Sequence, residues 1–123
     1  QSGDMDGALE DYKKSVQADP EFYDGNYYAG ALLLEKSREI VVELGSLSDD
    51  EWEAKSQSMT EESNGYYKEA IPYFEKALEI KPDNTDIMAI LFQINTRLKN
   101  TADAEKYNKM LIELKGPNWQ DAG

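Results

Sequence analysis

Carboxylates are the most numerous side chains in this sequence that could perform chemistry, with 25 Asp and Glu residues. Asp4, Asp6 and Gly7 have the order found in calcium-binding loops, where acidic residues at alternating positions supply oxygen ligands. No register of this segment, however, places a Glu at the twelfth position together with ligands at the first, third and fifth. We therefore interpret residues 4–7 as a turn that leads into a helix, and we predict no metal site.

A second group of carboxylates lies between residues 49 and 62, where six acidic residues are accompanied by Lys55 alone. Their local net charge of −5 could attract cations or a basic partner. Such a run is more commonly the solvated face of a helix, and acidic residues in a first turn also interact favourably with the helix dipole. We expect a solvated helical surface here. The acidic residues are Asp49, Asp50, Glu51, Glu53, Glu61 and Glu62.

The composition excludes several classes of function. The chain has 123 residues with no Cys and no His, so thiol and imidazole catalysis, disulfides and Cys/His zinc or haem sites are absent. Carboxylate pairs could still perform acid–base chemistry, but none stands beside a recognisable pocket, and we expect no enzyme and no cofactor. A net charge of −12 disfavours nucleic acid. The longest nearly apolar run, Tyr27–Leu34, is too short to span a bilayer, which predicts a soluble protein.

An internal repeat organises the chain. Residues 7–20 align without a gap to residues 69–82, at an offset of 62 residues. A third, weaker copy begins at Ala104, which follows Ala70 by 34 residues, so that 28 additional residues separate the first two copies. Repeats of this length indicate stacked units of supersecondary structure. The matching pairs are Ala8 and Ala70, Tyr12 and Phe74, Ser15 and Ala77, and Pro20 and Pro82.

These residues resemble the tetratricopeptide repeat family, whose 34-residue unit folds as two antiparallel helices. In the second helix of that unit, Ala is followed by an aromatic residue four positions on, by a small residue three positions later and by Pro after the helix. Both copies reproduce this order. Three positions depart from the pattern: Asn26 replaces a large apolar residue, Phe92 a small one and Asn108 an aromatic one.

Apolar spacing agrees with this interpretation. Leu9, Tyr12 and Val16 recur at intervals of three, four and seven, as on one face of an amphipathic helix. No alternation of period two is long enough to predict a sheet. We therefore predict an all-α fold of antiparallel helix pairs, stacked as a short α-solenoid similar to tetratricopeptide repeats, with one repeat elongated. Helix breaks are expected near residues 20–22, 45–48, 82–84 and 99–101.

A single domain over residues 1–115 is predicted, followed by a tail. Stacked repeats share one continuous core, because each unit buries its apolar face against its neighbours. The predicted parts are the second helix of a partial repeat (4–18), an extended repeat (22–81), a last repeat (85–115) and a C-terminal tail (116–123).

The extra residues of the middle repeat, about 45–65, are predicted to lengthen both of its helices into a projecting hairpin. Ser48 and Glu51 form a capping box, which predicts that a helix begins at this point. More residues are added to the second helix than to the first, and the two lengths do not balance. We therefore expect an irregular segment at residues 63–65.

By this resemblance the protein is a non-enzymatic scaffold that binds a peptide or partner helix on the concave side of the array, which the first helices line. Chaperone-binding members of the family use Lys, Asn and Arg side chains as a clamp that holds the end of an acidic tail. The corresponding groove positions of this sequence do not supply that clamp. A basic or apolar-aromatic ligand fits the charge better. Tyr27 is the expected anchor. The implied partner-binding residues are Asp24, Tyr27, Ala31, Leu34, Glu35, Asp86, Ala89, Gln93, Thr96 and Arg97.

An alternative is a structural role, in which the chain is an oligomerisation module or a fragment of a longer array with no separate ligand. The chain begins without Met, and the helix at 4–18 lacks a first-helix partner. Its surface carries one stripe of Ala8, Tyr12 and Ser15 and a neighbouring one of Leu9 and Val16. The next repeat can cover only part of this surface, which predicts an apolar edge that an upstream helix or a second copy covers. The sequence also resembles bacterial exported tetratricopeptide proteins, which implies a periplasmic or envelope location.

Overall fold

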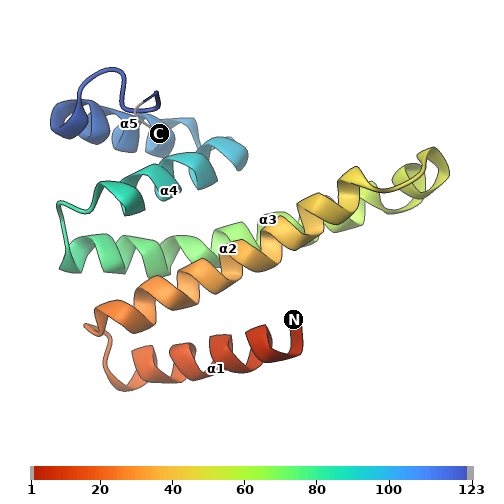
Figure 1. The fold of residues 1–123 in the computed structure, drawn as a ribbon, viewed down its shortest axis with the longest axis horizontal. Coiled ribbons are helices and arrows are strands. Elements are labelled where there is room, and N and C mark those ends of the chain that lie inside the picture. Colours follow the sequence, from red (N-terminus) through yellow and green to blue (C-terminus); the bar gives the residue numbers. More distant parts are fainter. Residues whose placement is uncertain (1, 122–123) are drawn as a thin grey trace.

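The helix-ending signals in the sequence divide residues 2–121, the part of the chain that this computed structural model describes, into five helices. Each packs against the next, and the predicted all-α fold of stacked helix pairs is confirmed. Figure 1 shows α2 and α3 projecting together to one side, beyond the other helices. The helices are α1 (Ser2–Ala18), α2 (Tyr23–Gly45), α3 (Asp49–Ile80), α4 (Thr85–Arg97) and α5 (Thr101–Lys115).

The breaks between these helices fall where they were predicted, and each has a local cause. The residue before Pro is disfavoured in helical geometry, so α1 ends before Asp19 and Pro20. The capping box is confirmed: the Ser48 hydroxyl accepts from the Glu51 amide at 3.3 Å, and the Glu51 carboxylate accepts from the Ser48 amide at 3.0 Å. At the start of α4, the side-chain oxygen of Asn84 accepts from the backbone N–H of Ile87 at 3.1 Å.

The prediction of an irregular segment at residues 63–65 is wrong, because α3 is helical without a break from Asp49 to Ile80. Ser63 instead packs against α2: the Ser37 hydroxyl donates to the Ser63 carbonyl at 2.5 Å, and both residues are buried. Ser37 lies eight residues before the end of α2, whereas Ser63 lies fourteen residues after the start of α3. Between this contact and the turn that joins the helices, α3 therefore has six more residues than α2.

Phe74 lies at the centre of the core, fully buried between α2 and α3. Its ring packs against the backbone of Gly30, where an added Cβ would lie 2.9 to 3.0 Å from three ring carbons. The small residues Ala29, Ala70 and Ala77, all fully buried, allow the same close approach along this helix pair. The repeat residues seen in the sequence are thus the contacts that join the two helices.

The expected apolar edge on α1 is also wrong for the residues that the structure describes. Leu9 is buried, and Ala8 and Val16 are half-buried. Val16 reaches the backbone of α2, where a Cβ on Gly25 would lie 3.0 Å from its methyl group. The outward side of α1 is polar. Its exposed residues include Asp4, Glu10, Asp11, Lys14 and Gln17.

The hydrogen bonds of Asn26 explain why this polar residue stands where the repeat pattern has a large apolar one. Its side-chain amide is buried and donates to the carbonyls of Pro20 and Phe22, at 3.0 and 2.9 Å. A buried donor needs such partners, and here it fixes the turn between α1 and α2. An apolar residue at this position would leave both carbonyls without that donor.

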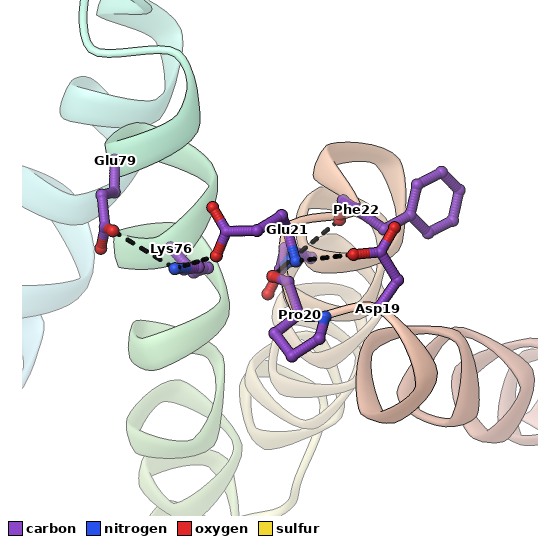
Figure 2. A network of polar contacts seen from close by, with 7 residues as sticks. Asp19, Pro20, Glu21, Phe22, Lys76 and Glu79 are labelled. Atoms are coloured by element: carbon purple, nitrogen blue, oxygen red, sulfur yellow. Dashed lines mark hydrogen bonds and ion pairs between the residues drawn. The ribbon is translucent and has the colours of Figure 1, made fainter.

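An ion pair between side chains links the same turn to α3. Figure 2 shows Lys76 between the carboxylates of Glu21 and Glu79, with the Asp19 side chain accepting from the Glu21 amide. The hydrogen bonds to Glu21 and then to Glu79 raise the pKa of Lys76. Two further ion pairs hold α1, from Lys13 to Glu69 at 2.6 Å and from Lys36 to Asp6.

Trp119 packs on the α4–α5 pair. Its contacts explain the other two departures from the repeat pattern, Phe92 and Asn108. Its ring meets Phe92 edge to face with centroids 5.2 Å apart, and its indole N–H donates to the Asn108 side chain at 2.9 Å. Gly116, with φ at +93°, ends α5 and turns the chain back towards α4. Gln1, Ala122 and Gly123, which the predicted division of the chain includes, lie outside the described residues.

We predict that Gly30→Ala lowers the free energy of unfolding by about 1–3 kcal/mol, because the new methyl group would overlap the Phe74 ring in a packed core. Ala is intrinsically favoured over Gly in a helix by about 1 kcal/mol, so this loss would appear despite the better propensity. Gly65→Ala is the matched control, since no atom lies within 4 Å of its new methyl group. Urea denaturation followed by circular dichroism measures both. Equal stability of the two variants would contradict the packing argument.

Candidate interaction groove

A groove of about 580 Å³ separates α2 from α4, and we call it the α2–α4 groove. One wall comes from the second half of α2 and the other from α4, while Tyr67 of α3, which is 5% exposed, lies between them. A cavity of this size is in the range that binds drug-sized groups. Its lining residues are Leu34, Arg38, Val41, Val42, Tyr67, Ile90, Phe92, Gln93, Ile94, Thr96 and Arg97.

The elongation of α2 creates this groove. Leu34, Arg38 and Val41 recur at intervals of four and three, so they share one face of α2 and point into the same space. Val42 follows them and remains 75% exposed. Because α2 has 23 residues and α4 only 13, the last turns of α2 continue past the body of the stack (Figure 1). The result is an apolar wall without a helix packed on it.

The charged groups of the groove are both cationic. Arg38 and Arg97 are the two arginines of the chain, and both line the groove. The Arg97 guanidinium lies over the Tyr67 ring, 5.5 Å from its centroid, which is a cation–π distance. Arg38 lies 3.7 Å from the carboxylate of Glu35, and both of these side chains are more than half exposed. Among the described residues, no Asp or Glu lines the groove.

A second cavity of about 290 Å³ continues from the groove towards the tip of the hairpin, and we call it the tip cavity. The two share Val41 and Arg97. Trp52, from the first turn of α3, is 49% exposed and lines the tip cavity. The other lining residues are Leu44, Gly45, Thr60, Ser63 and Asn64.

The region from Ser63 to Asp121 matches a family model. The model is that of the tetratricopeptide repeat family. The match covers residues 63–121, which comprise α4, α5 and the second half of α3. No significant match was found among curated proteins or among solved structures. Tetratricopeptide repeats are protein–protein interaction modules and are typically non-catalytic, and no enzyme family was found.

Four of the ten predicted contact residues line the α2–α4 groove: Leu34, Gln93, Thr96 and Arg97. The other six lie outside its lining. Of these, Asp24, Glu35 and Asp86 are exposed, and Tyr27, Ala31 and Ala89 are half-buried.

Tyr27, the expected anchor, belongs to an aromatic cluster within the tetratricopeptide-like stack. Its ring meets Phe74 and Tyr28 edge to face, with centroids 6.0 and 5.2 Å away, and stacks on Tyr23 at 6.0 Å. Tyr12 of α1 extends the cluster by stacking on Tyr28 at 5.5 Å. Tyr23 is not part of the groove lining. Its hydroxyl oxygen accepts a hydrogen bond from the Asn84 side-chain amide at 3.0 Å. The Tyr27 side chain therefore contributes to packing.

Sequence reasoning missed Arg38, Val41 and Val42 because it counted groove positions only within a helix of ordinary repeat length. The signal was present, since Val41 follows Leu34 by seven residues and Arg38 follows it by four. Ile90 and Tyr67 were missed for another reason. Tyr67 is 5% exposed and Ile90 is half-buried, and the sequence does not show that a cavity between α2 and α4 reaches them.

Two other kinds of site were sought in the described residues. Within residues 2–121, no group of three acidic, His or Cys side chains is placed to hold a metal ion. None of the helices described over that range is both long and apolar enough to cross a membrane.

Tyr107 lies beside a third cavity, of about 300 Å³, between α3 and α5. Its side chain is 3% exposed, and burial raises its pKa to about 12, with smaller contributions from the carboxylates of Glu75 and Asp103. Burial disfavours the phenolate because its charge would lose water. The tyrosine is a neutral packing residue at ordinary pH.

We predict that this pKa makes part of the stability alkali-sensitive. The folded state binds the phenol proton more tightly than the unfolded state, whose pKa is about 10, so stability falls as the pH rises from about 10 to about 12. Tyr107→Phe lacks this proton and should lose less stability over that interval. Urea denaturation of both proteins at pH 8, 10 and 11.5 measures the difference. Parallel pH profiles would show that Tyr107 ionises equally easily in both states.

Proposed function

We propose that this chain is a non-enzymatic scaffold that binds a protein segment, as a peptide or a partner helix, in the α2–α4 groove. One observation carries the proposal: an apolar groove lies between α2 and α4 and is open to solvent. Val42 lines it and is the most exposed large apolar residue in the part of the chain that the structure describes. Exposed apolar surface of this kind is characteristic of interaction sites.

The expected partner chemistry is supported in its apolar part. Leu34, Val41, Val42 and Ile90 supply aliphatic surface that an apolar or aromatic side chain can cover. The expectation of a basic ligand rested on the net charge of the whole chain, whereas the charges in the groove are those of Arg38 and Arg97. The groove therefore does not support a basic ligand.

The predicted contacts outside the groove extend the proposed surface along the first helices. Asp24, Glu35 and Asp86 are exposed and could make rim contacts, which typically contribute little energy. Tyr27, Ala31 and Ala89 are half-buried and would act mainly by shaping the surface.

A structural role in a longer array is the second candidate, and one observation favours it. Ile112 and Leu114 of α5 are 38% and 52% exposed, on the last helix of the stack. A further helix pair packed on α5 would cover them, as neighbouring repeats cover one another. The polar outer side of α1 offers no matching support at the other end.

We predict that blocking the groove abolishes partner binding. Gln93 is exposed and lines the groove, so Gln93→Trp should fill it without disturbing the core. Gln17→Trp, on the polar side of α1, is the matched control because it places the same residue at another exposed helical position. Affinity capture from the native host with all three proteins identifies the partners, and calorimetry with each purified partner gives the affinities.

Loss of a groove anchor typically reduces affinity by about 2 kcal/mol or more. We therefore expect Gln93→Trp to weaken a genuine partner at least about thirtyfold and Gln17→Trp to have no effect. A partner that binds all three proteins equally does not use the groove. If such a partner is lost with Leu114→Gln instead, the array role is the correct one.

A further inference from the structure

We propose that the α2–α4 groove and the tip cavity together select a partner segment that is apolar and acidic. This inference rests on the proposed function and adds the chemistry of the ligand. It reverses the expectation drawn from net charge, and it follows from where the few cations of the chain lie.

The distribution of charge is the first argument. The chain has 25 acidic residues and 13 basic ones, yet the lining described for the groove holds two arginines and no carboxylate. Arginine is suited to carboxylates because its planar guanidinium offers paired donors. Both arginines of the chain lie at this one site, and the lysines lie elsewhere.

The available donors are the second argument. The Arg97 guanidinium lies over the Tyr67 ring, 5.5 Å from its centroid, and among the described residues it makes no ion pair. Arg38 has one neighbouring carboxylate, Glu35, at 3.7 Å, and this exposed pair is weak. A ligand carboxylate can therefore bind either arginine without displacing a strong internal partner.

The apolar surface has the dimensions of a short helix or strand. From Leu34 to Val42 the wall of α2 covers nine residues, a rise of about 12 Å at 1.5 Å per residue. The tip cavity continues this wall through Val41 and Arg97 to Trp52. Trp52 is 49% exposed, and Trp is among the residues that most often anchor a partner. Arg97 lies where the two cavities meet, so it can bind a carboxylate in the middle of an apolar ligand.

Two synthetic peptides of eighteen residues test the inference. Both carry Leu at intervals of three and four and a fluorescent label, and they differ only in having Glu or Lys at every polar position. Fluorescence anisotropy at 50 and 300 mM salt gives their affinities for the whole chain. We expect the Glu peptide to bind more tightly, although the chain itself carries a charge of −12.

Matched variants identify the charges responsible. Arg38→Gln combined with Arg97→Gln should weaken the Glu peptide about tenfold at low salt, and less at high salt, because exposed ion pairs are individually weak and are screened. Lys68→Gln combined with Lys109→Gln removes the same charge at two exposed positions outside both cavities. This control should change the affinity less than twofold, as expected for charges remote from the ligand.

The outcomes separate the inference from the proposed function. Tighter binding of the Lys peptide, blocked by Gln93→Trp, would overturn the acidic preference and leave the groove as the binding site. Binding of either peptide that survives Gln93→Trp would contradict both proposals. Equal effects of the arginine and lysine variants, or no binding of the Glu peptide, would overturn the inference. If sedimentation shows a dimer that the arginine variant dissociates, the occupant is a second copy and the commitment to a separate partner is wrong.

Discussion

The approach of the Phe74 ring to the backbone of Gly30 is the contact on which the rest of the structure depends. It brings α2 and α3 so close that a single methyl group would not fit between them. Tyr27 meets the same ring edge to face, and Tyr28 and Tyr12 connect that contact to α1. Close packing of this kind fixes the relative positions of the two helices as well as stabilising them. The direction in which both long helices leave the stack is therefore set at this contact.

The groove is a consequence of that direction. Beyond Gly30, the buried Ser37 and Ser63 keep the two helices in contact, and their hydrogen bonds satisfy polar groups that would otherwise be costly to bury. The capping box at Ser48 then begins α3 so that it returns along α2. Each feature is local, but together they bring Arg38, Val41 and Val42 into the lining of the groove beside α4. Without the extended helices, the concave side would have no apolar wall at this position.

The sequence alone predicted the helices but only part of the site, and the reason is physical. Pro20, Pro82 and the Ser48 capping box act within a few residues, so the breaks that they cause can be read directly. The groove depends on which residues of α2 pass beside α4, and that is set by helix lengths and crossing geometry. Leu34, Gln93, Thr96 and Arg97 were found because they lie within ordinary repeat positions. Phe92 and Asn108 looked like departures from the repeat because their partner, Trp119, lies outside the last repeat predicted from the sequence, residues 85–115.

The charge of the partner is the property that the sequence alone predicts least well. A net charge of −12 is a property of the whole surface, and it influences the approach of a partner from a distance. At physiological ionic strength the field of an exposed charge is largely screened beyond about 8 Å, so the ligand in contact with the groove experiences mainly the groups that line it. The charged groups that line it are Arg38 and Arg97, with the Glu35 carboxylate 3.7 Å from Arg38. The overall negative charge would slow the association of an acidic partner and favour encounter with a basic one. The contacts in the groove, in contrast, favour an acidic segment. A partner must therefore satisfy both conditions, which an apolar segment with a few carboxylates does better than a highly charged one.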